Sequence, residues 1–454
     1  MSIETTIALQ VEHLETLDGA RRAALLERGR SHLGELRAAV TRILEDVRER
    51  GDTALLFYAA QFDAAPKSLR VPREEIDGAL AMANPAYVTA LRQSAANIER
   101  FHRAQRRTEP PIETAPGVRI QRVWRPLSRV GVYVPGGGAR YPSCLLMAAI
   151  PARVAGCAEV AVCTPPDRDG RVPAPVLAAA AIAGVTEVYA AGGVQAIAAL
   201  AYGTETIRRV DKLVGPGSSY VAAAKALVAS EVATDLPAGP SEILIVADET
   251  APPEWVAADL LAQAEHGPES ACVLVTTSAA LAGAVRAALA RRIETLPTAP
   301  VIRASLARNG ALLVAESLAG ALAFANDYAA EHLELMLVDA DRAVERIAHA
   351  GSVFLGSWSA VAAGDYASGG NHTLPTAGYA RGFGPLAVET FGRWMQVQRL
   401  SAAGLDGLRE TITTLAGVEG LPAHADSITA RFEPPSSQSP VAAESGMKEG
   451  TGDA

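Results

Sequence analysis

The feature that most constrains the fold is a regular alternation, from Val130 onward, of short apolar runs and alanine-rich segments long enough to be helices. Apolar runs of this length are typical of buried strands, and strands that alternate with helices form parallel sheets. One series of strands is predicted at residues 130–134, 159–163, 187–190 and 210–214, and a second at 243–247, 271–276, 311–315, 333–338 and 352–355. The sequence therefore predicts an α/β fold with two tandem α/β units.

The length and composition agree with this prediction. The chain has 454 residues, which at roughly 150 residues per domain allows two or three domains. Hydrophobic residues make up 49% of the chain and aromatic residues 5%, a profile typical of a tightly packed, helix-rich α/β enzyme. Residues 20–107 are predicted to form helices that cover the second sheet, and Asn84 and Pro85 are the N-cap and first residue of one of them. The small polar residues after Glu433 predict a disordered tail.

The charge pattern disfavours nucleic acid and membranes as partners. The formal net charge is −9, which would repel a phosphate backbone. The densest basic cluster, Arg103 with Arg106 and Arg107, is interpreted as the solvated end of a helix. Residues 1–10 lack the pattern of a signal peptide, and glycine and glutamine interrupt the longest uncharged stretches. We expect a soluble cytoplasmic protein.

The cysteines are predicted to pack in the interior rather than to form disulfides or bind a metal. The sequence contains Cys144, Cys157, Cys163 and Cys272, each in an apolar run. Their spacing is too irregular for a disulfide framework or a thiolate zinc site. We therefore expect four small buried side chains.

Three strands of the first series run directly into glycine-rich turns, at residues 135–138, 192–193 and 215–217. Such turns stand at the carboxyl ends of parallel strands, where doubly wound folds bind ligands. The strict dinucleotide fingerprint is absent because Tyr141 and Tyr220 occupy the positions of the third glycine. Backbone amides and helix N-termini still allow a nucleotide to bind at these turns.

Two segments contain candidate metal ligands. Gln263 and His266 are spaced i, i+3 in the last turn of a predicted helix, so that their side chains share one face. The polar loop 364–372 contributes Asp365 and His372, either to a metal or to a substrate. The alternatives are a packed or capping histidine in the first segment, and in the loop a turn bonded to its own backbone.

Glu331 and His332 are the candidate acid–base pair. They lie between a predicted helical run and the strand at 333–338, and at such a junction both side chains can project into one cleft. A carboxylate and an imidazole are suited to general acid–base catalysis. The alternative is a surface glutamate beside a core histidine.

These segments together resemble the histidinol dehydrogenase family, from about residue 51 to about Arg431. The motifs that carry the resemblance are at residues 51–55, 131–137, 238–242, 263–268, 331–334, 351–356 and 364–375. The resemblance implies two incomplete Rossmann-like domains with doubly wound parallel sheets, of the aldehyde dehydrogenase/histidinol dehydrogenase type, with helical N-terminal and C-terminal extensions.

The resemblance also implies a division of the chain. It comprises an N-terminal arm (1–24), a first α/β domain with the zinc and acid–base residues (25–129 plus 238–380), an NAD-binding Rossmann-like domain (130–237), a C-terminal helical arm that reaches the partner subunit (381–432) and a disordered tail (433–454). A homodimer with shared active sites is implied.

The family's functional residues carry over position by position. Four residues match the ligands of one zinc ion per subunit: Gln263, His266, Asp365 and, from the partner subunit, His424. Glu331 and His332 match the acid–base pair. The positions that match substrate contacts are Ser241, Gln263, His266, His332, Asp365, His372, Glu419 and His424. Tyr133, Gln195 and Ser218 match NAD contacts, although the family commonly has asparagine at the position of Ser218.

The activity that the resemblance implies is the zinc-dependent four-electron oxidation of L-histidinol to L-histidine by two NAD, through bound L-histidinaldehyde, in histidine biosynthesis. His332 is expected to act as base in both oxidations and Glu331 to activate the water that hydrates the aldehyde. The alternatives are a paralogue that oxidises another small polar alcohol, a zinc hydrolase, and a catalytically silent binding protein. Glu419 and His424 favour histidinol, and the glycine turns disfavour the hydrolase.

Overall fold

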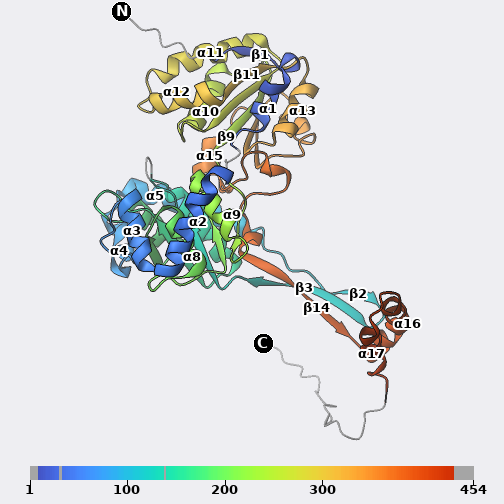
Figure 1. Cartoon of the computed structure of the whole chain (residues 1–454). Coiled ribbons are helices and arrows are strands. Elements are labelled where there is room, and N and C mark those ends of the chain that lie inside the picture. The colour runs from blue at the N-terminus through green and yellow to red at the C-terminus, as the bar shows by residue number, and fades with distance from the viewer. Residues whose placement is uncertain (1–8, 30–32, 137–139, 434–454) are drawn as a thin grey trace, which may run out of the picture. The chain divides into compact units, whose positions relative to one another are not determined.

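The computed structural model describes residues 9–29, 33–136 and 140–433. The chain divides into two compact units, a larger unit of Met1–Arg106 with Pro126–Arg393 and a smaller unit of Arg107–Arg125 with Trp394–Ala454. Two parallel sheets with their helices belong to the larger unit, and a three-stranded sheet with two helices belongs to the smaller one (Figure 1). The tail predicted to be disordered lies, after Glu433, outside the described residues.

The first sheet of the larger unit has six strands in the order β1-β11-β10-β9-β12-β13, and the paired strands run parallel. Its strands are β1 (Val11–His13), β9 (Glu242–Ala247), β10 (Ala271–Thr276), β11 (Gly310–Val314), β12 (His332–Met336) and β13 (Ser352–Leu355). The strands of the second predicted series are thus confirmed, those at 271–276 and 352–355 with the predicted bounds.

Helices cover both faces of the six-stranded sheet. They are α1 (Gly19–Leu26), α10 (Pro253–Ala264), α11 (Ala279–Ile293), α12 (Ala299–Asn309), α13 (Leu318–Tyr328), α14 (Ala340–Val344) and α15 (Val361–Tyr366). Residues of β9 point alternately to the two faces. Ile243 and Ile245 pack with residues of α10, α11 and α12, whereas Leu244 and Val246 pack with residues of α1 and α13. A strand buried on both faces must be apolar throughout, which is why these strands are visible in the sequence.

The second sheet has five parallel strands in the order β6-β5-β4-β7-β8. Its strands are β4 (Arg129–Tyr133), β5 (Glu159–Thr164), β6 (Glu187–Ala190), β7 (Lys212–Val214) and β8 (Ala233–Thr234). The helices around it are α2 (Leu33–Arg50), α3 (Asp52–Phe62), α4 (Arg73–Met82), α5 (Pro85–Arg103), α6 (Pro142–Ala155), α7 (Ala174–Ala183), α8 (Gly193–Tyr202) and α9 (Ser219–Val228). The predicted first strand series is confirmed, and the Asn84 side chain caps α5 through the Ala86 N–H, 2.8 Å away.

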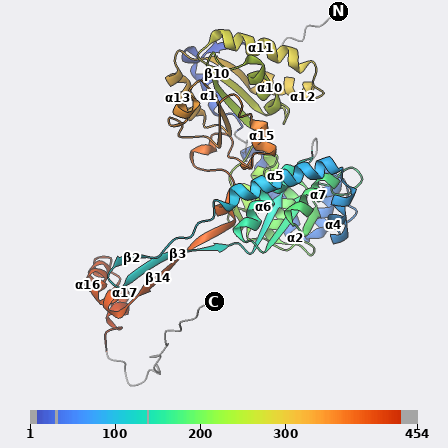
Figure 2. The same ribbon diagram turned by 180° about the vertical axis from the view of Figure 1, so that it is seen from behind.

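The helices before Val130 cover a different sheet from the one predicted. They were expected to cover the second predicted sheet, but α2, α4 and α5 pack against α8, α7 and α6 of the five-stranded sheet (Figure 2). Val40, Val47 and Leu55 belong to the same buried cluster as Ile197 of α8. The physical reason is that an apolar helix face requires burial without specifying its partner. The first of these helices, α1, packs on the six-stranded sheet.

The smaller unit contains a sheet in addition to the helices expected for the arm at 381–432. It contains a sheet in the order β14-β3-β2, followed by two helices. The elements are β2 (Ile112–Ala115), β3 (Val118–Pro126), β14 (Gly392–Leu400), α16 (Ala402–Val418) and α17 (Pro422–Thr429). The rings of Trp124 and Trp394 pack edge to face, with centroids 5.5 Å apart. β14 is largely exposed and β3 is mostly half-buried, so both lack the buried apolar run by which the other strands were recognised.

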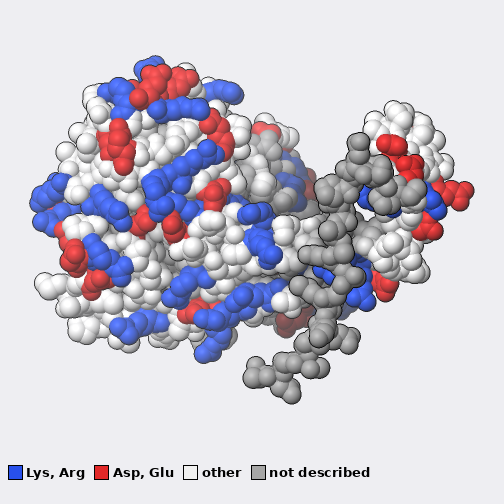
Figure 3. All heavy atoms as spheres, turned by 90° about the horizontal axis from the view of Figure 1, so that it is seen from below, with Lys and Arg blue, Asp and Glu red and all other residues white. Residues whose placement is uncertain are grey.

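Short 3-10 helices are also described at η1 (Leu14–Thr16), η2 (Tyr379–Arg381) and η3 (Val388–Phe391). Among the described residues, no helix combines the length and hydropathy that a membrane crossing requires. On the face shown in Figure 3, basic and acidic side chains are interspersed. The four cysteines are free thiols, and Cys144, Cys163 and Cys272 are buried, as expected, while Cys157 is half-buried.

One ion-pair cluster joins three strands of the five-stranded sheet. The buried Arg129 bonds Glu159 at 2.5 Å and Glu187 at 2.6 Å, and the Tyr189 hydroxyl also donates to Glu187. Burial disfavours the ionised Glu187, but the bonds from Arg129 and Tyr189 outweigh it and lower the pKa of Glu187 from 4.5 to about 2. The folded state therefore binds the proton less readily than the unfolded state.

We expect this difference to appear in acid denaturation. The stabilisation from Glu187 is complete above its ordinary pKa of 4.5 and is lost as the pH falls through that value toward about 2. Glu187→Gln removes the titrating group, so the variant is less stable at neutral pH and loses less stability on acidification. Urea midpoints of both proteins between neutral and acidic pH provide the measurement. Parallel curves for the two proteins would contradict the assignment.

Candidate active site

The candidate acid–base pair lies at the amino end of β12. Ala329 adopts a left-handed conformation, with φ of 50°, and ends α13. The chain then turns into the sheet, so that Glu331 directly precedes the strand and His332 is its first residue. Both residues are buried, with relative exposures of 5% and 4%. The expected junction between helix and strand is confirmed, and it places the two side chains next to each other.

Hydrogen bonds determine how His332 is oriented. Its Nδ1 lies 3.0 Å from the carbonyl oxygen of Glu242 and 3.4 Å from Oε2 of Glu331. A carbonyl oxygen can only accept, so Nδ1 carries a proton, and in the neutral ring Nε2 presents its lone pair. Nε2 has no hydrogen-bond partner and lies 3.7 Å from Oδ1 of Asp365. In its neutral form the imidazole is therefore held as the tautomer whose Nε2 can accept a proton.

The surrounding carboxylates control the charge of this imidazole. Burial lowers the pKa of His332, but Glu331 and Asp365 outweigh burial and raise it well above its ordinary value. Burial also disfavours the ionised Asp365, and the neighbouring histidines reverse that effect, so its pKa is lowered. A cation beside Asp365 would offset this attraction and favour the neutral imidazole, which can accept a proton.

The other loop residue, His372, belongs to the same buried group. Its Nδ1 lies 2.9 Å from the carbonyl oxygen of Asp365, and its Nε2 is buried without a partner. Burial lowers the pKa of His372 and favours the neutral ring. The loop is thus not simply a turn bonded to its own side chains, because it leaves a ring nitrogen free to bind a ligand.

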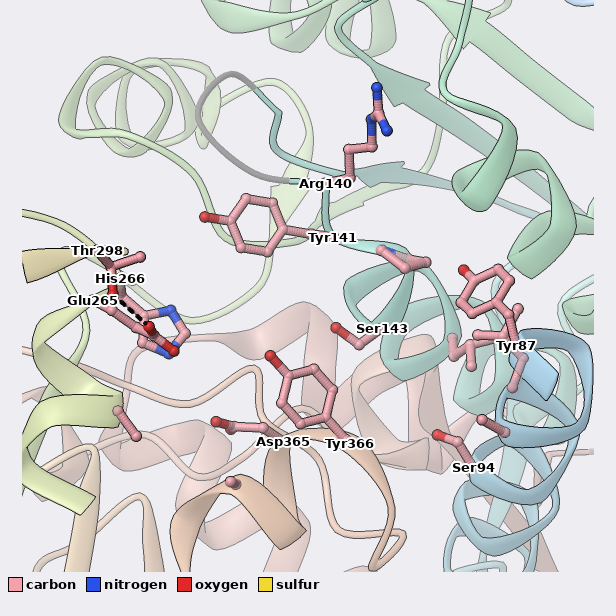
Figure 4. A pocket seen from close by; sticks show the side chains of 16 residues that line it. Tyr87, Ser94, Arg140, Tyr141, Ser143, Glu265, His266, Thr298, Asp365 and Tyr366 are labelled. Carbon is pink, nitrogen blue, oxygen red and sulfur yellow. Dashed lines mark hydrogen bonds between the residues drawn. The ribbon is translucent and has the colours of Figure 1, made fainter. Parts of the chain in front are cut away.

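A cavity of about 440 Å³ opens beside these residues. His266, Asp365 and Tyr366 line it together with Tyr141 and Arg140, which follow the first glycine turn (Figure 4). Residues 137–139 of that turn lie outside the described residues. The lining of the cavity therefore combines two candidate ligand groups, His266 and Asp365, with tyrosine and arginine side chains.

The candidate metal ligands are only partly assembled. Helix α10 ends at Ala264, so His266 lies just beyond the helix rather than in its last turn, and its N–H bonds the Gln263 carbonyl at 3.3 Å. Among the described residues, no group of three or more His, Cys, Asp or Glu side chains is arranged to hold a metal. Two of the four predicted zinc ligands, His266 and Asp365, line the cavity.

The donor chemistry nevertheless suits a zinc ion. Gln263 is buried and its amide nitrogen has no partner, which leaves the amide free to turn its oxygen toward an ion. Imidazole nitrogen, carboxylate oxygen and amide oxygen are ligands that zinc accepts. His424 belongs to α17 and Glu419 is the C-cap of α16, both in the smaller unit, so their predicted roles stay predictions.

The predicted NAD residues lie along the carboxyl edge of the five-stranded sheet. Tyr133 ends β4, and its hydroxyl oxygen accepts the Gly193 N–H at 3.0 Å, at the start of α8. Gln195 is buried on α8 with an unpartnered amide nitrogen. Ser218 is the N-cap residue of α9, and its side chain makes no capping bond. These three side chains thus stand at two of the predicted glycine turns.

The turn at Gly215 is held in place by residues that the sequence did not single out. Gly215 has φ of 118°, and a Cβ there would overlap the Tyr133 carbonyl oxygen. Lys225 donates to the Gly215 carbonyl at 2.9 Å, and Asp235 accepts the Gly215 N–H at 2.7 Å. Lys225 and Asp235 also form a buried ion pair. A signal in the sequence was available, because a lysine in the alanine-rich stretch of α9 needs a partner once it is buried.

The fold and the site define an α/β enzyme with a buried acid–base pair and a sheet edge suited to a nucleotide. The family model described as histidinol dehydrogenase matches residues 26–432. The chain belongs to the histidinol dehydrogenase family and is an oxidoreductase. The resemblance and the α/β fold class predicted from the sequence are confirmed.

Similar proteins span nearly the same length. The histidinol dehydrogenase of Methanothermobacter thermautotrophicus is 48% identical over 416 residues, covering 91% of this chain and 98% of that one. That of Vibrio parahaemolyticus is 43% identical and covers 92% and 97%. The crystal structure of histidinol dehydrogenase from Elizabethkingia anophelis is 38% identical, with a TM-score of 0.88, and covers 93% and 97%.

Proposed function

We propose that this protein oxidises L-histidinol to L-histidine through bound L-histidinaldehyde, with two NAD, as the last steps of histidine biosynthesis. The observation that carries the proposal is the buried Glu331–His332 pair, whose free Nε2 is directed at a residue of the cavity. The family match over residues 26–432 supports it. A hydrolase or a silent binding protein does not fit a family of oxidoreductases.

His332 is the base in this proposal. Its Nε2 takes the alcohol proton of histidinol, while the bond from Nδ1 to the Glu242 carbonyl stabilises the imidazolium that results. Glu331 then accepts a proton from the water that adds to the aldehyde. His332 acts again when the hydrate is oxidised. When bound, NAD accepts the hydride in each oxidation.

Gln263, His266, Asp365 and His424 of the partner subunit would hold the zinc ion. When bound, zinc orients the amine and imidazole of the substrate as a template. Ser241, His372 and Glu419 complete the substrate contacts, and the side chain of His372 offers its unpartnered Nε2 for this purpose.

The protein acts as a cytoplasmic homodimer in this proposal. Leu415, Val418 and Leu421 of the smaller unit are exposed apolar side chains of the kind that a partner subunit covers. The zinc and acid–base residues belong to the domain around the six-stranded sheet, and NAD binds the domain around the five-stranded sheet.

The first test counts NADH formed per histidinol consumed by the purified, zinc-loaded protein. Two NADH per histidinol, with histidine as the product, are expected. Folded and metallated protein that forms no NADH would overturn the proposal. Turnover of another small amino or hydroxy alcohol in its place would identify the paralogous dehydrogenase.

Ser218 provides a test of the NAD site. Its hydroxyl is free of capping bonds, but it is shorter than the asparagine common in the family. Ser218→Asn is expected to lower the KM for NAD by a factor of about 2 to 13, the effect of one added hydrogen bond of about 0.5–1.5 kcal/mol. The KM for histidinol stays unchanged. Initial rates with NAD varied at saturating histidinol measure this, and an unchanged KM for NAD would remove Ser218 from the site.

A further inference from the structure

Glu242 is a buried carboxylate to which the proposed mechanism gives no chemical step. It is the first residue of β9, directly before the apolar run Ile243 to Ala247, and its relative exposure is 1%. A buried carboxylate is destabilising unless it is paired and hydrogen-bonded. The contacts of Glu242 therefore show what the fold gains from it.

The side chain of Glu242 accepts three hydrogen bonds. Arg28 donates from Nη2 to Oε1 at 2.6 Å, and the Glu331 N–H donates to the same oxygen at 3.1 Å. The Ala377 N–H donates to Oε2 at 3.2 Å. The Arg28 guanidinium also stacks on the buried Tyr328 ring, 3.3 Å from its centroid. This carboxylate thus ties the residue before β12 to two other segments.

The backbone of Glu242 contacts the same pair of residues. Its N–H donates to Oε2 of Glu331 at 2.8 Å, and its carbonyl oxygen accepts from Nδ1 of His332 at 3.0 Å. Glu242 and Glu331 therefore exchange reciprocal bonds, each carboxylate accepting the backbone N–H of the other residue. The bond to Nδ1 selects the tautomer of His332 whose Nε2 is free.

We propose that Glu242, clamped by Arg28, is a positioning residue that orients both Glu331 and His332 for proton transfer. This inference rests on the proposed function for its kinetic consequence, but the tautomer of His332 is a consequence of the geometry alone. Glu242 does not touch the reacting atoms. It acts by setting where the Glu331 carboxylate lies and which imidazole nitrogen accepts the proton.

Glu242→Gln tests this proposal with almost no change in volume. The amide has one acceptor oxygen, so either the Glu331 or the Ala377 N–H loses its partner, and Arg28 loses its counter-charge. We expect kcat for histidinol to fall about 10- to 100-fold, the effect of a displacement of about 1 Å in a catalytic group. The KM values for histidinol and NAD stay within about threefold because no substrate contact is removed.

Two further variants separate positioning from general destabilisation. Glu187→Gln, the matched control, breaks another carboxylate–arginine pair in the five-stranded sheet and should lower stability with kcat unchanged. Arg28→Met removes the ion pair of Arg28 with Glu242 but leaves both Glu242 oxygens able to accept the Glu331 and Ala377 N–H groups. We therefore expect kcat to fall less in Arg28→Met than in Glu242→Gln. Arg28→Lys keeps the positive charge and should have a kcat between those of Arg28→Met and the wild type. If Glu242→Gln does not fold, an unchanged kcat in Arg28→Met overturns the proposal.

A spectroscopic measurement separates this inference from the proposed function. Nitrogen-15 NMR of histidine-labelled protein, at a pH high enough to make His332 neutral and with His332→Asn to assign the signal, should show the Nδ1–H tautomer in the wild type and a mixture in Glu242→Gln. This result stands even if the wild type does not oxidise histidinol. The same tautomer and the same kcat in both proteins would overturn the positioning role, whatever the substrate is.

Discussion

Replacing His332 by asparagine is expected to lower kcat for histidinol by about 10³-fold, within the range of about 10² to 10⁴ for a lost general base. The asparagine amide can still donate to the Glu242 carbonyl, which now accepts from Nδ1 at 3.0 Å, so the local structure should survive. The amide has no basic nitrogen in place of Nε2. Steady-state kinetics together with the metal content of the purified protein measure the effect.

The metal content distinguishes a base from a ligand. Nε2 of His332 lies 3.7 Å from Oδ1 of Asp365, close to the predicted zinc ligands but not among them. We therefore expect one zinc per chain in His332→Asn, as in the wild type. A folded variant that has lost its zinc would show that His332 is a ligand and that the assignment of its role is wrong. Asp365→Ala is the matched variant that should lose both zinc and turnover.

Glu331→Gln is expected to separate the two oxidations. The glutamine oxygen can still accept the Glu242 N–H, now 2.8 Å from Oε2, but the amide cannot take a proton from water. Hydration of the aldehyde should slow by about 10²-fold, the lower range for general base catalysis, while the first oxidation slows much less. Rapid-mixing measurements should then show one NADH formed quickly and the second slowly.

The product distribution checks this assignment. An aldehyde trap such as semicarbazide should intercept histidinaldehyde in Glu331→Gln and leave about one NADH per histidinol, while the wild type still forms two. Equal slowing of both oxidations would contradict a role for Glu331 in hydration alone. It would place the residue with His332 in the first proton transfer.

The elements that the sequence predicted best are those buried on both sides. β10 has the predicted bounds because a strand covered by helices on both faces is an uninterrupted apolar run between turns. β14 escaped prediction because most of its residues are exposed and carry no such run. Its partner β3 lies more than 250 residues earlier in the chain, and no local pattern relates the two.

The candidate site likewise contains residues that the sequence indicated and contacts that only the structure revealed. Glu331, His332, Gln263 and His266 were singled out by residue type and spacing, and Asp365 by its polar loop. Glu242 was recognised only as part of a motif, although a glutamate before five apolar residues signals a buried carboxylate in need of partners. Which partners those are, Arg28 and the N–H groups of Glu331 and Ala377, cannot be inferred from a strand pattern.

The sequence by itself determined that the chain forms two parallel α/β units, because strand and helix periodicity are local properties of residue order. It also determined the types of chemical group available, an imidazole, carboxylates and an amide, through motifs that identify the family. Only the tertiary structure decided which sheet α2–α5 cover and which way the His332 ring faces. Both depend on contacts between residues far apart in the chain, such as Glu242 and Glu331, which are 89 positions apart. Apolar helix faces and buried polar groups require partners, but the local sequence does not specify which residues those partners are.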